Sequence, residues 1–199
     1  MQNSLFKSFY SFLIVLIFLI FFIPCFFFPL FMSSDVSSFF PSSSGYLWPI
    51  PGYTTITSYF GKRVSPTAGA SSFHKGIDIG APENTQLIAT VSGTITYTGF
   101  LGGGGYTITL SPDENTKITY CHVSPNFIVK KGDEVLQGQL IGFVGPMYVD
   151  NVPGNQYHDA SGRPTNGAMT GTHLHLGVRI NEEYIDPLSL FEINSSTLQ

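Results

Sequence analysis

The sequence predicts an all-β domain, mainly antiparallel, preceded by one N-terminal transmembrane helix. From Thr54 onward, short segments rich in β-branched and aromatic residues alternate with turns that contain glycine or proline. Residues 9–32 contain no charged side chain and are long enough, at the rise of an α-helix, to cross a bilayer. Few stretches show helical periodicity, and no long internal repeat is present.

The N-terminus is divided into a cytoplasmic segment, residues 1–8, and an uncleaved signal-anchor, residues 9–32. Lys7 precedes the span, while Asp35 follows it with no nearby Lys or Arg. This charge asymmetry predicts a single-pass protein of the cell membrane with its folded domain outside the cytoplasm. A cleaved signal peptide is the alternative, but no small-x-small site ends the apolar run.

Residues 33–45 are dominated by serine and are interpreted as a linker. The following segment, residues 46–192, is long enough for one domain with its own core, and residues 193–199 form a C-terminal tail. Without Lys7, 8 basic residues face 13 acidic ones. This acidic excess disfavours nucleic acid as a partner.

The expected strands are separated by turns rich in glycine, and the clearest are Leu87–Val91, Gly93–Thr98, Tyr106–Leu110, Lys117–Val123, Leu140–Val144 and Thr172–Ile180. The glycines at 102–105 indicate a flexible hairpin turn. They do not indicate a phosphate-binding loop, because no Gly-Lys-Ser/Thr follows. Lys130 and Lys131 precede Gly-Asp and are expected at an exposed turn.

Histidine and aspartate recur at spacings that bring them to one face of a strand. In extended backbone, residues two and four apart share a face, so His74 and Asp78 would point the same way. Gly76 between them adds no side chain and would leave room for an ion. Ile77 and Ile79 would point into a core.

The same alternation recurs further along the chain. His173 and His175 share one face, and the other face is apolar: Leu174, Leu176 and Val178. By the same rule Tyr120 and His122 would share a face. Cys121 would then turn away from that face as a small buried hydrophobe. No disulfide is expected, because Cys25 lies in the membrane segment.

These residues suit a catalytic zinc site. Such a site supplies three protein ligands and leaves a fourth position open, and His74, Asp78 and one histidine of the closing pair make such a set. The remaining histidines could orient water, exchange protons and stabilise an oxyanion. The helical His-Glu-x-x-His signature is absent from the sequence.

From roughly Thr57 to Phe191 the chain resembles the lysostaphin-type (LytM-like) zinc metalloendopeptidases, which cut peptide bonds in bacterial peptidoglycan. Several short motifs carry the resemblance and occur in the family's order: Phe60-Gly-Lys-Arg63, His74-x-Gly-x-Asp78 followed by Ile79-Gly-Ala-Pro82, Gly93-Thr-Ile, Tyr120-Cys-His-Val-Ser124, Val129-Lys-Lys-Gly-Asp-Glu-Val135, Gly138-Gln-Leu-Ile-Gly-Phe-Val-Gly145, His173-Leu-His175 and Asp186-Pro187.

The resemblance implies that His74, Asp78 and His175 bind one Zn²⁺ per chain at the floor of a groove. It makes His122 and His173 the catalytic histidines, without dividing the tasks between them. The implied substrate is a peptidoglycan peptide, and the implied reaction is hydrolysis by metal-activated water. Some relatives have lost ligands and act as activators or scaffolds, but every motif position is filled here.

Three features outside these roles remain. The segment from Pro146 to Thr170 looks longer than the family's usual turn and is expected on the groove rim, where it could shape substrate choice. Arg63 could hold a substrate carboxylate or Asp78, or lie at the surface. His158 falls outside every motif and is expected to be solvated or locally hydrogen-bonded.

Two other functions are compatible with the sequence. The domain could be a non-catalytic peptidoglycan-binding or regulatory module in a cell-wall, secretion or conjugation complex. It could also cut a protein substrate in such an apparatus. The sequence does not indicate which peptide bond would be cleaved.

Overall fold

A computed structural model of the chain describes residues 45–191. The predicted anchor, nearly all of the predicted linker and the predicted tail lie outside the described residues. Within residues 45–191, no helix has the length and apolar character needed to cross a membrane.

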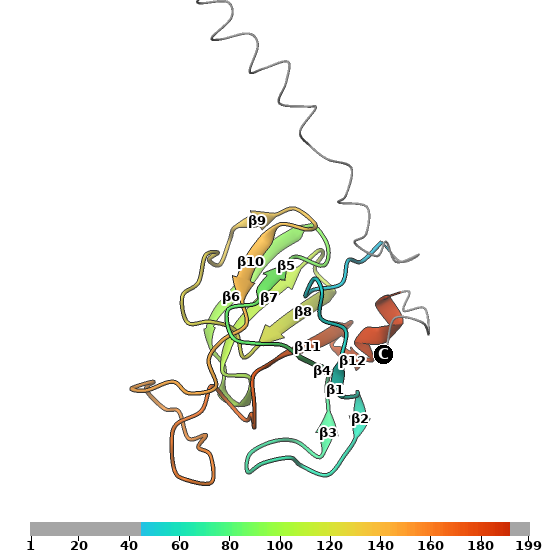
Figure 1. The fold of residues 1–199 in the computed structure, drawn as a ribbon. Coiled ribbons are helices and arrows are strands. Elements are labelled where there is room, and N and C mark those ends of the chain that lie inside the picture. The colour runs from blue at the N-terminus through green and yellow to red at the C-terminus, as the bar shows by residue number, and fades with distance from the viewer. Residues whose placement is uncertain (1–44, 192–199) are drawn as a thin grey trace, which may run out of the picture. The chain divides into compact units, whose positions relative to one another are not determined.

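An eight-stranded antiparallel sheet forms most of the domain (Figure 1). Its strands lie in the order β1–β4–β11–β8–β7–β6–β9, and β12 pairs with β11. The bounds are β1 Ile56–Ser58, β4 Ile77–Gly80, β6 Gly93–Phe100, β7 Tyr106–Ser111, β8 Thr116–Cys121, β9 Glu134–Val135, β11 His173–Ile180 and β12 Glu183–Ile185.

The other strands of the described part of the chain form two small sheets. One pairs β5 Gln86–Ile88 with β10 Leu140–Phe143, and the other pairs β2 Gly61–Lys62 with β3 Phe73–His74. Two short 3₁₀ turns are also present, η3 Gly102–Gly104 and η4 Pro187–Leu190. Because every pairing between described strands is antiparallel, the predicted all-β, mainly antiparallel fold class is confirmed.

The predicted strands all occur, with shifts at their ends. The strand predicted as Leu87–Val91 ends at Ile88, and the one predicted as Lys117–Val123 ends at Cys121. The second ends early because His122 has a φ of 60°, in the left-handed region that does not continue a strand. The glycines at 102–105 do connect the antiparallel strands β6 and β7, as expected for a hairpin.

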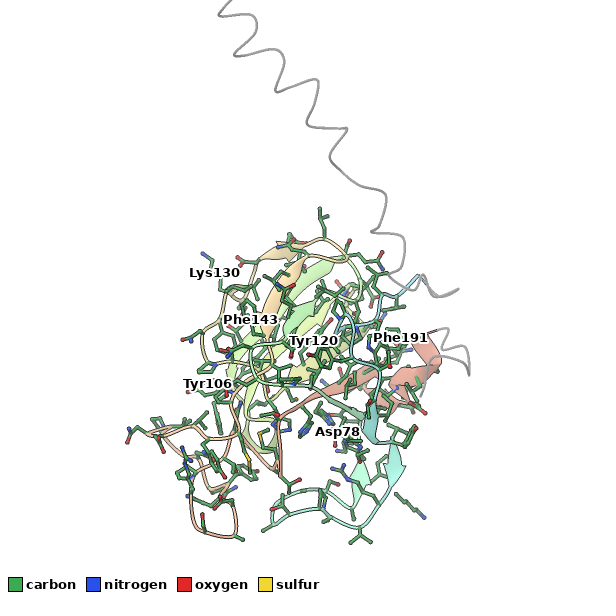
Figure 2. The ribbon with its side chains drawn as sticks, viewed as in Figure 1. Asp78, Tyr106, Tyr120, Lys130, Phe143 and Phe191 are labelled. Carbon is green, nitrogen blue, oxygen red and sulfur yellow. The ribbon has the colours of Figure 1, made fainter. Side chains whose placement is uncertain are left out.

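The core lies on one face of the large sheet, where the β5–β10 sheet packs against it. Tyr120 of β8 is fully buried there, and its hydroxyl donates to the Ile88 carbonyl at 3.1 Å and accepts from the Thr90 amide at 3.0 Å. Burial raises the pKa of Tyr120 to about 12. Figure 2 shows Tyr120 among the packed side chains of these strands.

Candidate metal centre and substrate groove

The opposite face of the large sheet carries a row of polar side chains that crosses neighbouring strands. His175 of β11 is in register with Asp78 of β4 on one side and with Cys121 of β8 on the other. Register partners project to the same face of a sheet, so these three side chains lie side by side. Figure 2 labels Asp78 at this position, where β4 lies beside β1.

Three donor atoms from separate strands converge at this row. His74 Nε2 lies 2.9 Å from His175 Nδ1 and 3.1 Å from Asp78 Oδ1, and His175 Nδ1 lies 2.9 Å from Asp78 Oδ1. Tetrahedral zinc bonds of about 2.0–2.1 Å hold donor atoms roughly 3.3 Å apart. The nitrogen and oxygen donors of these side chains therefore fit a zinc ion in both type and spacing.

His74 and Asp78 meet by way of a bend at residues 75–76, which separates β3 from β4. The apolar face was predicted correctly, since Ile77 and Ile79 are fully buried. The sequence predicted that Gly76 leaves room for an ion, but in the structure neighbouring atoms of β11 fill that space. A Cβ at Gly76 would clash with the Leu176 carbonyl oxygen and would lie 2.8 Å from the His175 ring, so the missing side chain lets residue 76 pack closely against β11 and leaves room for that ring.

Neighbouring groups fix the orientation of the donor atoms. His74 Nδ1 lies 2.9 Å from the Tyr59 carbonyl oxygen, which can only accept, so Nδ1 carries the proton and Nε2 presents its lone pair. Arg63 Nη1 donates to Asp78 Oδ2 at 3.2 Å and to Ser58 Oγ at 2.6 Å. Of the roles considered for Arg63, the structure shows the contact with Asp78.

The protonation states also suit a cation. Burial alone would raise the pKa of Asp78, but its contacts with the neighbouring histidines, His175 foremost, outweigh burial and hold that pKa far below its usual value. Burial lowers the pKa of His175, which keeps the imidazole neutral. An ionised Asp78 carboxylate beside a neutral His175 imidazole is the form in which these two side chains bind a metal.

Two further histidines lie beside the three donors. The rings of His122 and His173 are edge to face with centroids 4.7 Å apart, and the His122 and His175 centroids are 6.3 Å apart. His122 Nδ1 donates to the Asn166 carbonyl at 2.7 Å, and His173 Nδ1 donates to the Gly171 carbonyl at 2.8 Å. In each ring this leaves the lone pair on Nε2.

His122 is neutral over the physiological range of pH. Burial above all, together with the neighbouring His173 and His175, lowers the pKa of its imidazole to about 3. Its Nε2 has no hydrogen-bond partner among the described residues. It is thus an uncharged acceptor beside the candidate metal ligands.

The prediction that Tyr120 and His122 share a face, with Cys121 behind them, is wrong. Tyr120 faces the core, whereas Cys121 lines the groove and His122 lies beyond the end of β8. The positive φ of His122 interrupts the alternation and brings its ring to the site. Cys121 is free and buried, as expected, and burial raises the pKa of its thiol to about 12.

Asn166 is a site residue that no sequence motif indicated. It is fully buried, its carbonyl orients His122, and its side-chain Oδ1 accepts from the Tyr106 amide at 2.8 Å. Its Nδ2 donates to the Val123 carbonyl at 3.1 Å. The only local signal is Asn-Gly, a turn dipeptide, and this does not reveal a contact with a residue 44 positions away.

The row opens into a groove of about 930 Å³. The β2–β3 loop lies along one side, and the last residues of the 146–170 segment lie along another, since Ala168, Met169 and Thr170 line the groove. The expected rim position is confirmed for these residues. The tip of the segment reaches the other loop, because the Tyr157 ring would lie 2.7 Å from a Cβ at Gly69.

His158 lies apart from the site, as predicted. It is exposed, and its Nδ1 donates to the nearby Gln156 carbonyl at 3.1 Å.

The model of Peptidase family M23 matches residues 72–187 of this chain. The chain belongs to peptidase family M23. The matched region begins just before His74 and ends after His175, so it includes the candidate metal ligands and both flanking histidines.

The sequence is also similar to that of a protein named as a peptidase. The DD-carboxypeptidase/endopeptidase Mpg of Neisseria meningitidis serogroup B is 33% identical over 138 residues, which cover 69% of this chain and 27% of that protein. This chain therefore spans only 27% of the length of that relative.

Solved structures of M23 proteins share the fold. The catalytic domain of EnpA, a prophage-encoded protein of Enterococcus faecalis, has 26% identity and a TM-score of 0.50, covering 69% of this chain and 90% of that domain. Lysostaphin from Staphylococcus simulans has 26% identity and a TM-score of 0.53, covering 69% of this chain and 49% of lysostaphin.

Proposed function

We propose that this chain is a zinc endopeptidase that hydrolyses peptide bonds in the stem peptides or crosslinks of peptidoglycan. One observation carries the proposal: His74, Asp78 and His175 converge at 2.9–3.1 Å in a groove, with His122 and His173 beside them. Membership of the M23 family supports a peptidase, and the name of one relative, the peptidoglycan DD-endopeptidase ShyC of Vibrio cholerae, supports peptidoglycan as the substrate.

In this proposal His74 Nε2, Asp78 Oδ1 and His175 Nδ1 bind one Zn²⁺. A bound zinc ion polarises the scissile carbonyl group and lowers the pKa of a water molecule. Arg63 holds the second carboxylate oxygen of Asp78, which leaves Oδ1 directed at the other donors.

His122 and His173 act on protons in the groove. The carbonyls of Asn166 and Gly171 fix both rings with Nε2 as the acceptor. A neutral His122 can therefore accept a hydrogen bond from the attacking water and take up its proton. A protonated ring can then donate to the oxyanion or to the leaving amine, with His173 as the second donor or acceptor.

The location of the reaction follows from the sequence prediction. With residues 9–32 as an uncleaved anchor and Lys7 on the cytoplasmic side, the domain lies outside the cell membrane. The groove would then meet the cell wall close to the membrane surface.

The test is a digest of purified peptidoglycan by the zinc-loaded full chain in mild detergent, with products read by mass spectrometry. New amine termini are expected, and their masses identify the bond. His122→Ala should retain zinc by metal analysis but lose turnover by roughly a hundredfold or more. Asp78→Ala and His175→Ala should lose both zinc and turnover.

His158→Ala is the matched control, since this exposed histidine lies outside the site. It should retain zinc and activity. Loss of zinc in His122→Ala would show that the roles are wrongly assigned. A folded, zinc-loaded wild-type chain that cleaves no wall peptide would instead favour the non-catalytic binding or scaffold function.

A further inference from the structure

The groove extends along the sheet from the candidate metal centre to a cationic end. His175, Gly177 and Arg179 alternate on the groove face of β11, and Arg179 is in register with Lys117 of β8 and Tyr184 of β12. At a strand rise of about 3.3 Å per residue, Arg179 lies roughly 13 Å along β11 from His175.

The floor between these two points is provided by β8, because the backbone of Lys75 packs over Gly177 on β11. Gly177 has no side chain, and a Cβ there would lie 3.3 Å from the Lys75 carbonyl and 3.6 Å from His175 Nε2. On the neighbouring strand, Thr119 is in register with Gly177 and also lines the groove. An extended peptide could therefore run over β8, past Thr119, from the candidate metal ligands to Lys117 and Arg179.

The cationic end holds more positive than negative charge. Glu182 contacts both cations: Lys117 Nζ lies 2.9 Å from Oε1, and Arg179 Nη1 lies 3.1 Å from Oε2. A third cation, Lys75 Nζ, lies 4.8 Å from the centre of the Tyr184 ring. Two cations thus share one carboxylate, with a third cation nearby, in a chain whose formal net charge is −4.

This arrangement is unfavourable for stability alone. Like charges directly opposite each other on neighbouring strands repel, and Lys117 and Arg179 are such a pair. Their single carboxylate partner, Glu182, is 68% exposed and lies in a turn with a φ of 67°. Both cations keep part of their side chains accessible, at 36% for Lys117 and 30% for Arg179.

We propose that Lys117 and Arg179 form a subsite for a free carboxylate of the substrate, three to four residues from the scissile bond. The inference rests on the proposed function and names its substrate class: peptides with a free, unamidated carboxyl group at that position. The Glu182 carboxylate already contacts this pair, which shows the chemistry that the pair binds. An extended peptide advances about 3.3–3.6 Å per residue, so the roughly 13 Å between the sites corresponds to that number of residues.

The test uses two crosslinked muropeptides from one wall digest that differ only in whether one stem carboxyl is free or amidated. Their kcat/KM is measured with the zinc-loaded full chain in mild detergent. The free form should be preferred by roughly tenfold, as for a charge-assisted contact. Lys117→Gln and Arg179→Gln should each reduce turnover of the free form and leave the amidated form nearly unchanged.

Two more variants sharpen the test. Glu182→Gln removes the internal carboxylate and should increase the preference for the free form. Lys130→Gln is the matched control, because this exposed lysine lies in a turn outside the groove. Thermal unfolding curves establish that each variant is folded.

Binding separates this proposal from the proposed reaction. The affinity of the His122→Ala chain for both muropeptides is measured by titration calorimetry, so that neither is consumed. Tighter binding of the free form, lost in Lys117→Gln, supports the subsite even if the wild type cleaves nothing. Equal affinity and equal kcat/KM for both forms would overturn the subsite while leaving the endopeptidase intact.

Discussion

Replacing Asn166 by alanine should reduce both stability and turnover without removing the metal. The substitution leaves the buried Val123 carbonyl and the partly buried Tyr106 amide without their partners. An unpaired buried group costs about 1–3 kcal/mol and a partly buried one less, so we expect a loss of about 2–4 kcal/mol. For a domain of this size, that lowers the midpoint of thermal unfolding by roughly 5–15 °C.

Turnover should fall as well, because the Asn166 carbonyl that orients His122 is no longer held by the side chain. The measurements are thermal unfolding by circular dichroism, zinc content and peptidoglycan turnover. Asn166→Asp keeps the acceptor for Tyr106 but buries a carboxylate oxygen against the Val123 carbonyl, so its midpoint should fall at least as far as that of Asn166→Ala. A midpoint for Asn166→Ala within 1 °C of the wild type, by the scale of roughly 2–4 °C per kcal/mol, would refute the reasoning.

Three further predictions concern the site. Gly76→Ala places a Cβ against the Leu176 carbonyl and the His175 ring, so it should lower both the midpoint of thermal unfolding and the zinc affinity measured by competition with a chelator, whereas unchanged values would show that the backbone and the ring can move. In zinc-free protein, His122 should contribute stability above about pH 6.5 that is lost as the pH falls toward about 3, because the unfolded chain binds the proton more tightly. Chemical unfolding at several pH values should therefore show a shallower acid loss in His122→Gln. Cys121 should resist iodoacetamide at pH 8 in the native state and react after unfolding, since burial raises its pKa to about 12.

Alternation along single strands was the most informative sequence signal. It predicted that His173 and His175 share a face, and Leu174 and Leu176 are indeed fully buried on the other. Such a pattern depends only on the local geometry of the strand. The order of strands in the sheet depends on contacts between distant segments. The alternation within each strand therefore did not indicate that β4 lies beside β11.

The missed features involve backbone conformations and carbonyls. The alternation rule failed at His122 because a positive φ there is determined by its surroundings, with the amide donating to Gly104 and the ring to Asn166. Asn166 orients His122 mainly through its carbonyl, a group that every residue has. The pairing of Lys117 with Arg179 likewise depends on the register between β8 and β11.

The proposed metal ligands come from segments far apart in the chain, since Asp78 and His175 are separated by 97 positions and meet through the pairing of β4 with β11. During synthesis, a growing chain that has not reached His173 holds His74 and Asp78 but lacks the strand that orders them. The site is therefore among the last parts of the domain to form, because long-range strand pairing follows local structure. With the proposed function, the chain would stay inactive while nascent or truncated, and its activity would report that β11 has been inserted between β4 and β8.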